Sequence, residues 1–218
     1  MDKITLGTRN VSIEFPGVKA LSNVDFEIET GVIHALMGAN GAGKSTLMKV
    51  LAGSNPGYTG DVLYNGNPVE LRNPAAAKKL GIQIVYQEVD MALIPTLTVA
   101  ENVMFNDLVM NMGHKQFVNY GKIRKDAKEA LARLNVNIDV RRMCGTLTLA
   151  QKQMVLIARA VQSACNFLIL DEPTAPLSDT ETEELFRVVR HLRKTENLAV
   201  IFITHRIHEV LQICDSYT

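Results

Sequence analysis

The stretch that decides the fold is Gly38–Thr46, "GANGAGKST". It fits the pattern G-x-x-x-x-G-K-[ST], whose glycines let the backbone curl until successive N–H groups point at phosphate oxygens. An apolar run, "VIHALMG" (Val32–Gly38), precedes it, and "KSTLMKVLAG" (Lys44–Gly53) follows as a helix that Gly53 ends. A phosphate-binding loop requires this order of strand, loop and helix, because the helix N-terminus adds partial positive charge. A chance glycine-rich turn is therefore the weaker interpretation.

We expect the residues of this loop to have distinct roles in binding a nucleotide. Lys44 is placed to reach the β- and γ-phosphates, Ser45 to ligate Mg²⁺, and Thr46 to bond the α-phosphate. The residues expected to hold the nucleotide phosphates are Gly38, Asn40, Gly41, Ala42, Gly43, Lys44, Ser45 and Thr46.

Strands alternate with helices along much of the chain. "GIQIVYQ" (Gly81–Gln87), "NFLILD" (Asn166–Asp171) and "AVIFITH" (Ala199–His205) are continuous apolar runs, typical of parallel strands covered on both faces. A further strand precedes the turn dipeptide Asn65-Gly66. Between Val89 and Arg142 the texture is mostly helical, and capping boxes at Thr98–Glu101 and Ser178–Glu181 open two helices. We predict one α/β domain over 1–218, with a nucleotide-binding core at 1–88 and 156–218 and a helical subdomain at 89–155.

Composition narrows the class of protein. Lys plus Arg equals Asp plus Glu at 23 each, which gives no electrostatic footprint for nucleic acid or for an anionic membrane. Cys144, Cys165 and Cys214 fit neither a disulfide framework nor a metal-ligand spacing. Apolar runs such as "LAVIFI" (Leu198–Ile203) are too short to span a bilayer. We expect a soluble intracellular protein whose membrane role, if it has one, comes through a partner.

Polar residues at strand ends are the candidates for chemistry. "FLILDE" ends in Asp171, placed to hold Mg²⁺ through water, and Glu172, placed to polarise an attacking water. Acidic residues end many strands, so this pair becomes specific only beside a phosphate loop. Gln87 and His205 end two further strands, and the carboxyl ends of parallel strands converge on the ligand crevice. We predict that Lys44, Gln87, Glu172 and His205 are catalytic.

Two further stretches leave alternatives open. Phe15, in "IEFPGVKAL", either stacks on adenine with Val18 beside it or merely fills the core. Thr148, Leu149, Ala150 and Gln151 form a T-x-x-Q capping box at the start of "KQMVLIARAV". That helix terminus is either an anion site or an ordinary capped core helix.

Taken together, these motifs resemble the ATP-binding subunit of an ABC transporter. Phe15 matches the adenine-stacking aromatic, "GANGAGKST" the Walker A motif, and Gln87 the Q-loop. "LTLAQ" falls where the family writes LSGGQ, before "LILDE" as Walker B, "APLS" (Ala175–Ser178) as the D-loop and His205 as the switch histidine. "FPGVKALSNVDFEI", "YQEV" and "LTVAENV" look like the importers of ribose, galactose and xylose, in particular the N-terminal of two tandem ATPase halves.

The chain departs from the family pattern at three places. The sugar branch writes the capping loop as LSV-x-Q, so "LTLAQ" is similar to its branch, although the Leu149 side chain obstructs the close approach that glycine permits. Ser178 stands where the family usually has Asp, which weakens contacts across a dimer. The chain stops at "CDSYT", where the family continues, so we expect it to be the first half of a longer protein.

The resemblance implies a P-loop NTPase (RecA-like) fold: a parallel-sheet core, an N-terminal antiparallel β part and an inserted all-helical subdomain. It implies ATP and Mg²⁺, with Ser45, Gln87 and Asp171 near the metal. In a head-to-tail dimer with a second ATPase half or subunit, Thr148–Gln151 would grip the partner's ATP. Glu172 would activate water, His205 would contact the γ-phosphate, and Gln87 would sense Mg²⁺ and the water.

The implied partners are transmembrane permease subunits and, indirectly, a solute-binding protein, with the chain on the cytoplasmic face of the membrane and no nucleic acid. Three alternatives stay open. The first is the ATPase of a nucleoside or autoinducer importer. The second is a half-domain that hydrolyses ATP only with its tandem partner, and the third is an ABC protein acting on ribosomes or DNA. Neutral charge and "LTVAENV" count against the last.

Overall fold

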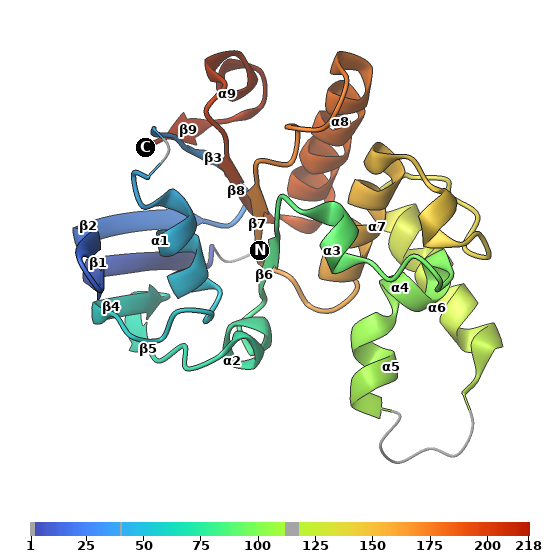
Figure 1. Ribbon diagram of the computed structural model, residues 1–218, viewed down its shortest axis with the longest axis horizontal. Coiled ribbons are helices and arrows are strands. Elements are labelled where there is room, and N and C mark those ends of the chain that lie inside the picture. The colour runs from blue at the N-terminus through green and yellow to red at the C-terminus, as the bar shows by residue number, and fades with distance from the viewer. Residues whose placement is uncertain (1–2, 40, 112–117) are drawn as a thin grey trace. The chain divides into compact units, whose positions relative to one another are not determined.

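The computed structural model describes residues 3–39, 41–111 and 118–218, which form two compact units (Figure 1). The first unit contains the chain up to residue 84, with 165–172 and 193–218; the second contains 85–164 and 173–192. Compactness thus groups 156–164 and 173–192 with the helices. The first of these segments contains the end of helix α7 (Leu149–Val161), which packs on α3 (Val89–Ala92), α4 (Val99–Val103) and α6 (Tyr120–Arg133). The predicted functional division at residues 88 and 155 stays a prediction.

An antiparallel sheet forms the N-terminal part of the first unit. Its strands are β1 (Thr5–Phe15), β2 (Val18–Glu29), β4 (Thr59–Tyr64) and β5 (Asn67–Val69), in the order β2-β1-β4-β5. Asn65 and Gly66, which link β4 to β5, both have left-handed backbones with φ of 51° and 73°. A two-residue hairpin turn of this kind favours Asn-Gly, so the turn dipeptide is confirmed.

A parallel sheet completes the first unit. Its order is β6-β7-β8-β3-β9, with bounds Ile82–Val85, Phe167–Asp171, Ala199–Ile203, Ile33–Leu36 and Ser216–Tyr217. Every residue of β3 and β8 is buried, as the continuous apolar runs predicted. Helices α1 (Lys44–Leu51), α2 (Pro74–Lys79) and α9 (Ile207–Ile213) belong to the same unit. The predicted fold class, a parallel core with an antiparallel part, is confirmed.

Helices make up the second unit. They are α3 (Val89–Ala92), α4 (Val99–Val103), α5 (Phe105–Asn111), α6 (Tyr120–Arg133), a 3₁₀ turn (Cys144–Thr146), α7 (Leu149–Val161) and most of α8 (Asp179–Glu196). The predicted capping boxes at Thr98 and Thr148 are both formed, and Ser178 exchanges the same bonds with Glu181. Among the residues placed by the structure, no helix combines the length and the apolar character that crossing a bilayer requires.

Candidate functional site

The phosphate loop joins the end of β3 to the start of α1. Gly38, Gly41 and Gly43 have φ of 152°, 84° and 89°, which side chains rarely adopt. A Cβ at Gly43 would lie 2.5 Å from the carbonyl oxygen of Ala20, so glycine alone fits there. Asn40 lies outside the described residues. The backbone therefore has the curled form that brings N–H groups together for an anion.

Lys44 closes this loop. Its Nζ donates to the carbonyl oxygens of Gly38 at 2.7 Å and Ala39 at 3.0 Å. The ammonium therefore lies at the loop's own backbone, where a phosphate seated on the N–H groups would meet a positive charge. Ser45 and Thr46 follow in the first turn of α1.

Ser45 meets the acidic pair at the end of β7. Its hydroxyl is hydrogen-bonded to Asp171, the last residue of that strand. Burial and the neighbouring Glu172 raise the pKa of Asp171, while the Ser45 hydrogen bond, Lys49 and Lys44 oppose the rise. A hydroxyl and a carboxylate are hard oxygen donors of the kind that Mg²⁺ prefers, so this pair fits a magnesium site.

Glu172 and His205 form a second pair within the same unit. His205 Nδ1 lies 3.2 Å from Glu172 Oε1, and the two side chains are 54% and 19% exposed. Glu172 has φ of 45°, and its backbone N–H donates to the carbonyl oxygen of Ile203 at 3.1 Å. The turn after β7 thus directs the Glu172 carboxylate toward His205, which lies two positions beyond the end of β8.

Phe15 and Val18 lie directly opposite each other at the end of the β1–β2 hairpin. They are 43% and 60% exposed, so Phe15 is not a core residue. Ala20, two residues beyond Val18, is the residue against which Gly43 packs. An open apolar pair therefore lies close to the phosphate loop, as adenine stacking would need.

The other predicted site residues belong to the second unit. Thr148 Oγ1 accepts from the Gln151 N–H at 3.2 Å, and Gln151 Oε1 accepts from the Thr148 N–H at 3.3 Å. Leu149 is exposed at the first helical position, whereas Ala150 is buried. Gln87 is exposed just after β6. Their relation to the phosphate loop stays a prediction.

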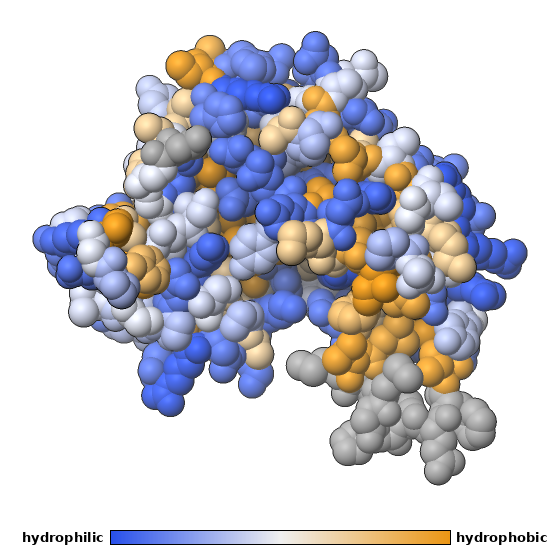
Figure 2. Space-filling view, in the orientation of Figure 1, coloured by the Kyte–Doolittle hydropathy of each residue, from blue (hydrophilic) through white to orange (hydrophobic). Residues whose placement is uncertain are grey.

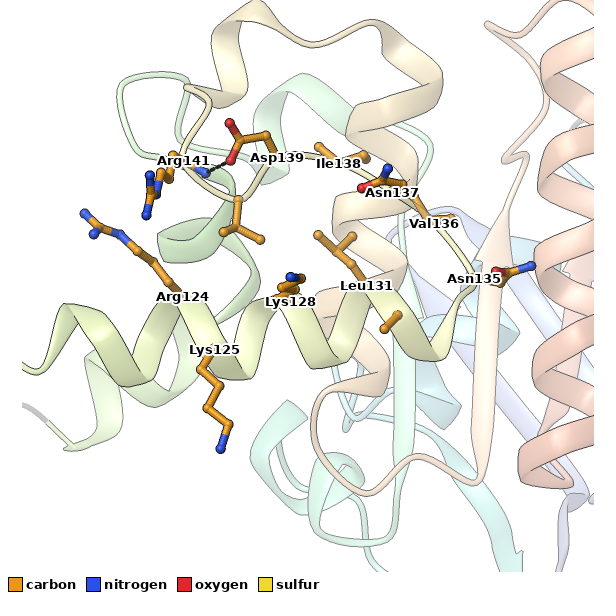
Figure 3. Close-up of a pocket in the computed structure, with 12 residues that line it drawn as sticks. Arg124, Lys125, Lys128, Leu131, Asn135, Val136, Asn137, Ile138, Asp139 and Arg141 are labelled. Carbon is orange, nitrogen blue, oxygen red and sulfur yellow. Dashed lines mark hydrogen bonds between the residues drawn. The ribbon is translucent and has the colours of Figure 1, made fainter.

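A groove of about 790 Å³ lies within the helical unit, between α6 and residues 135–141 (Figure 3). Arg124 and Lys128 border it from α6, and Arg141 lies across from them. The Asp139 carboxylate accepts from the Arg141 backbone N–H at 3.0 Å. No sequence-predicted site residue lines this groove, so its size does not make it part of the site.

The hydrogen bonds around His205 were not predicted from the sequence. Thr204, Arg206 and the fully buried Glu209 are linked by hydrogen bonds around it. The only sequence signal is an acidic residue at the third position of a short helix, which is too common to predict a burial of this kind.

Comparison with known proteins places the chain in a family. The family model described as "ABC transporter" matches residues 21–175. A ribose import ATP-binding protein of Rubrobacter xylanophilus is 44% identical over 213 residues, covering 98% of this chain and 42% of the relative. A putative ribose/galactose/methyl galactoside import ATP-binding protein of Agrobacterium fabrum is 45% identical over 214 residues, with coverage of 98% and 42%. The chain thus spans about two fifths of the length of these curated relatives.

The solved structures agree with the family model. The dimeric structure of a bacterial ABC transporter cassette, MJ0796, is similar with a TM-score of 0.78 and 25% identity, covering 97% of this chain and 93% of that one. The fold of this chain therefore matches that of a solved ABC transporter cassette. Since the family model covers more than half of its length, this chain belongs to the ABC transporter family.

Proposed function

We propose that this chain is the ATP-binding and ATP-hydrolysing part of an importer for a monosaccharide of the ribose or galactose type. One observation carries the proposal: Lys44, Ser45, Asp171, Glu172 and His205 lie in one compact unit, where a hydrogen bond links Ser45 of the phosphate-loop helix to Asp171 and another pairs Glu172 with His205. The sugar class is supported by the names of the two relatives, which describe ribose import and ribose/galactose/methyl galactoside import.

Nucleotide binding rests on the loop and the hairpin. The N–H groups of Gly38–Thr46 would donate hydrogen bonds to the phosphate oxygens, while the Lys44 ammonium would move from the carbonyls of Gly38 and Ala39 to the β- and γ-phosphate oxygens. The exposed face of Phe15, with Val18 beside it, would cover the adenine.

Ser45 and Asp171 would hold Mg²⁺, directly or through water, with Gln87 of the helical unit as a further oxygen donor. The bound cation would neutralise charge that develops on the phosphate oxygens. Burial and the neighbouring Glu172 raise the pKa of Asp171, with Ser45, Lys49 and Lys44 opposing the rise, so a bound cation would further favour the charged carboxylate that coordinates it.

Glu172 would accept the proton of the attacking water, since its carboxylate is the one not bonded to Ser45. His205 holds that carboxylate from one side, which fixes its direction while the imidazole contacts the γ-phosphate. Lys44 stabilises charge on the oxygens that leave with ADP.

The second ATPase half would complete the site. The start of α7, Thr148–Gln151, where Thr148 and Leu149 are exposed, would face the nucleotide on the partner's loop, and residues around Ser178 would line the dimer contact. The dimeric structure of the MJ0796 cassette supports such pairing. No role on nucleic acid is proposed, because the formal net charge is zero.

The helical unit would meet the permease. Apolar side chains gather over α5 and the start of α6 (Figure 2), where Val109 is 60% exposed and Tyr120 is 50% exposed. Met91 of α3, in the segment where the family contacts its membrane partner, is 81% exposed. Binding there would place the chain on the cytoplasmic face of the membrane, with a solute-binding protein acting on the other face.

A second candidate is a nucleotide-binding half that turns over only with its tandem partner. It is favoured by Leu149, whose side chain is 39% exposed at the first position of α7, where glycine would let a phosphate approach the backbone. Nucleoside or autoinducer import is less well supported, because the relatives' names describe sugars.

The test is ATP hydrolysis by this chain at increasing protein concentration, with Glu172→Gln alongside. We expect turnover that rises faster than linearly with concentration and that vanishes in the variant, while Mg²⁺-ATP binding persists. Hydrolysis at the wild-type rate in Glu172→Gln would falsify the assignment of the water-activating group. Tight binding without turnover at any concentration supports the second candidate.

A further inference from the structure

We propose that Glu209 is a positioning residue for His205: its buried carboxylate fixes the turn that holds the imidazole against Glu172. The inference rests on the proposed function, in which this pair acts on the water and the γ-phosphate. Glu209 lies in the first turn of α9, four residues beyond His205.

The carboxylate is tied to both neighbours of His205. The Thr204 hydroxyl donates to Glu209 Oε2 at 2.7 Å, and Arg206 Nη1 donates to Glu209 Oε1 at 3.2 Å. The Thr204 hydroxyl also accepts from the Arg206 backbone N–H at 3.0 Å, which closes a turn with His205 at its centre. Residues 204–206 are therefore held as one piece.

His205 depends on this turn because its own side chain is 54% exposed. Its hydrogen bond to Glu172 is 3.2 Å long, and more than half of the side chain faces solvent. The direction of the ring then follows the backbone of residues 204–206. Glu172 is anchored to the same strand, since its N–H donates to Ile203. Both members of the pair are thus set relative to the end of β8.

Burial of the Glu209 carboxylate argues that this group orients its neighbours rather than stabilising the core. Glu209 is 0% exposed and Thr204 is 2% exposed. A buried ion pair is a weak source of stability, because desolvation offsets the attraction, and an apolar residue of similar size would usually serve the core as well. What the carboxylate supplies that an apolar residue lacks is a fixed direction for the groups bonded to it.

Thr204→Val tests this, because it removes the hydroxyl and keeps the shape of the side chain. We expect kcat for ATP to fall about ten- to a hundredfold, the loss typical of a misplaced catalytic group, with little change in the KM for ATP. Thr204→Ser restores the hydroxyl and should recover most of the rate. Glu209→Gln, which keeps the volume, should lower kcat in the same sense as Thr204→Val.

The control is Thr98→Val. Thr98 Oγ1 donates to Glu101 Oε2 at 2.6 Å in the helical unit, so this variant removes the same kind of bond away from His205. It should lower Tm and leave kcat per folded molecule unchanged. In a His205→Ala background, Thr204→Val should have no further effect on kcat; an additive fall overturns the proposal, because the threonine then acts independently of His205.

A readout without hydrolysis separates this proposal from the proposed function. In ¹H–¹³C spectra of the histidine-labelled chain, the His205 ring signal is the one missing from His205→Ala. Thr204→Val should move that signal and leave the others in place, whether or not the chain turns over ATP. An unmoved His205 signal overturns the positioning role, whereas absent wild-type hydrolysis counts against the proposed function alone.

Discussion

Arg159 of α7 holds Asn102 of α4 at two points: its Nε donates to the backbone carbonyl at 2.6 Å and its Nη2 to the side-chain oxygen at 3.0 Å. A third nitrogen, Nη1, donates to the Ala92 carbonyl at 2.7 Å. Asn102 is fully buried and donates in turn to the Ile94 carbonyl at 2.9 Å. One guanidinium thus joins the ends or sides of three helices, and burial lowers the pKa of Arg159.

Arg159→Met should destabilise the helical unit. Three acceptors lose a charged donor while the apolar volume stays, so we expect the free energy of unfolding to fall by about 3 kcal/mol. Urea unfolding followed by circular dichroism measures this. Arg124→Met, an exposed arginine without a hydrogen bond or ion pair to the described residues, is the matched control and should change stability little. Equal effects of the two substitutions would show that the network contributes nothing.

Asp171→Asn should weaken the dependence of ATP binding on Mg²⁺. The amide keeps the size of the carboxylate and loses its charge, so the gain in ATP affinity on adding Mg²⁺ should shrink about tenfold or more. Titration of ATP with and without Mg²⁺ measures that gain. Asp139→Asn removes an exposed carboxylate at the groove of Figure 3 and should leave the gain intact. An undiminished gain in Asp171→Asn places the metal elsewhere.

Phe15→Ala should lower the affinity for ATP and spare the affinity for inorganic triphosphate. Base stacking on an aromatic ring contributes about 1–3 kcal/mol, so the Kd for ATP should rise roughly tenfold. Triphosphate has no base and meets only the loop. Leu211→Ala, at a site that is 80% exposed on α9, controls for loss of an exposed apolar side chain. A parallel loss for ATP and triphosphate contradicts the stacking role.

His34 should make stability depend on pH. It is 8% exposed, with Nδ1 2.7 Å from Ser216 Oγ and Nε2 2.9 Å from Thr218 Oγ1, and burial lowers its pKa from 6.5. The unfolded chain therefore takes up a proton at a higher pH than the folded chain does. The contribution of neutral His34 is complete above about pH 6.5 and is lost as the pH falls below it.

The measurement is the free energy of unfolding between about pH 8 and pH 5 for the wild type and His34→Gln. The wild-type curve should fall more steeply below about pH 6.5, because glutamine takes up no proton. Curves that stay parallel over this range rule out His34 as the source.

Much of the fold follows from local chemistry that the sequence displays. Gly43 needs both a left-handed backbone and contact with Ala20, and Asn65-Gly66 needs a turn that few other pairs adopt. Continuous apolar strands require cover on both faces, which leaves a parallel sheet. These constraints act within a few residues or along one element, so pattern reasoning reaches them.

The remainder depends on contacts between distant parts of the chain. Arg159 and Asn102 are 57 positions apart, and the sequence of neither helix predicts that their side chains form hydrogen bonds. Glu209 looks like any acidic residue in a first helical turn, and only the packed structure shows that it is buried. Within the candidate site, the sequence pattern nominates the residues, whose roles stay predictions, while the hydrogen bonds among them are visible only in the structure.

The left-handed backbone of Glu172 sets stability against activity. An ordinary residue with φ near 45° costs about 1–2 kcal/mol relative to glycine, so Glu172→Gly should make the fold more resistant to heat while removing the carboxylate that the chemistry needs. Selection for stability alone would therefore discard this glutamate, and only selection for turnover retains it. A relative that has lost hydrolysis is expected to drift toward glycine or asparagine at this position and to melt at a higher temperature.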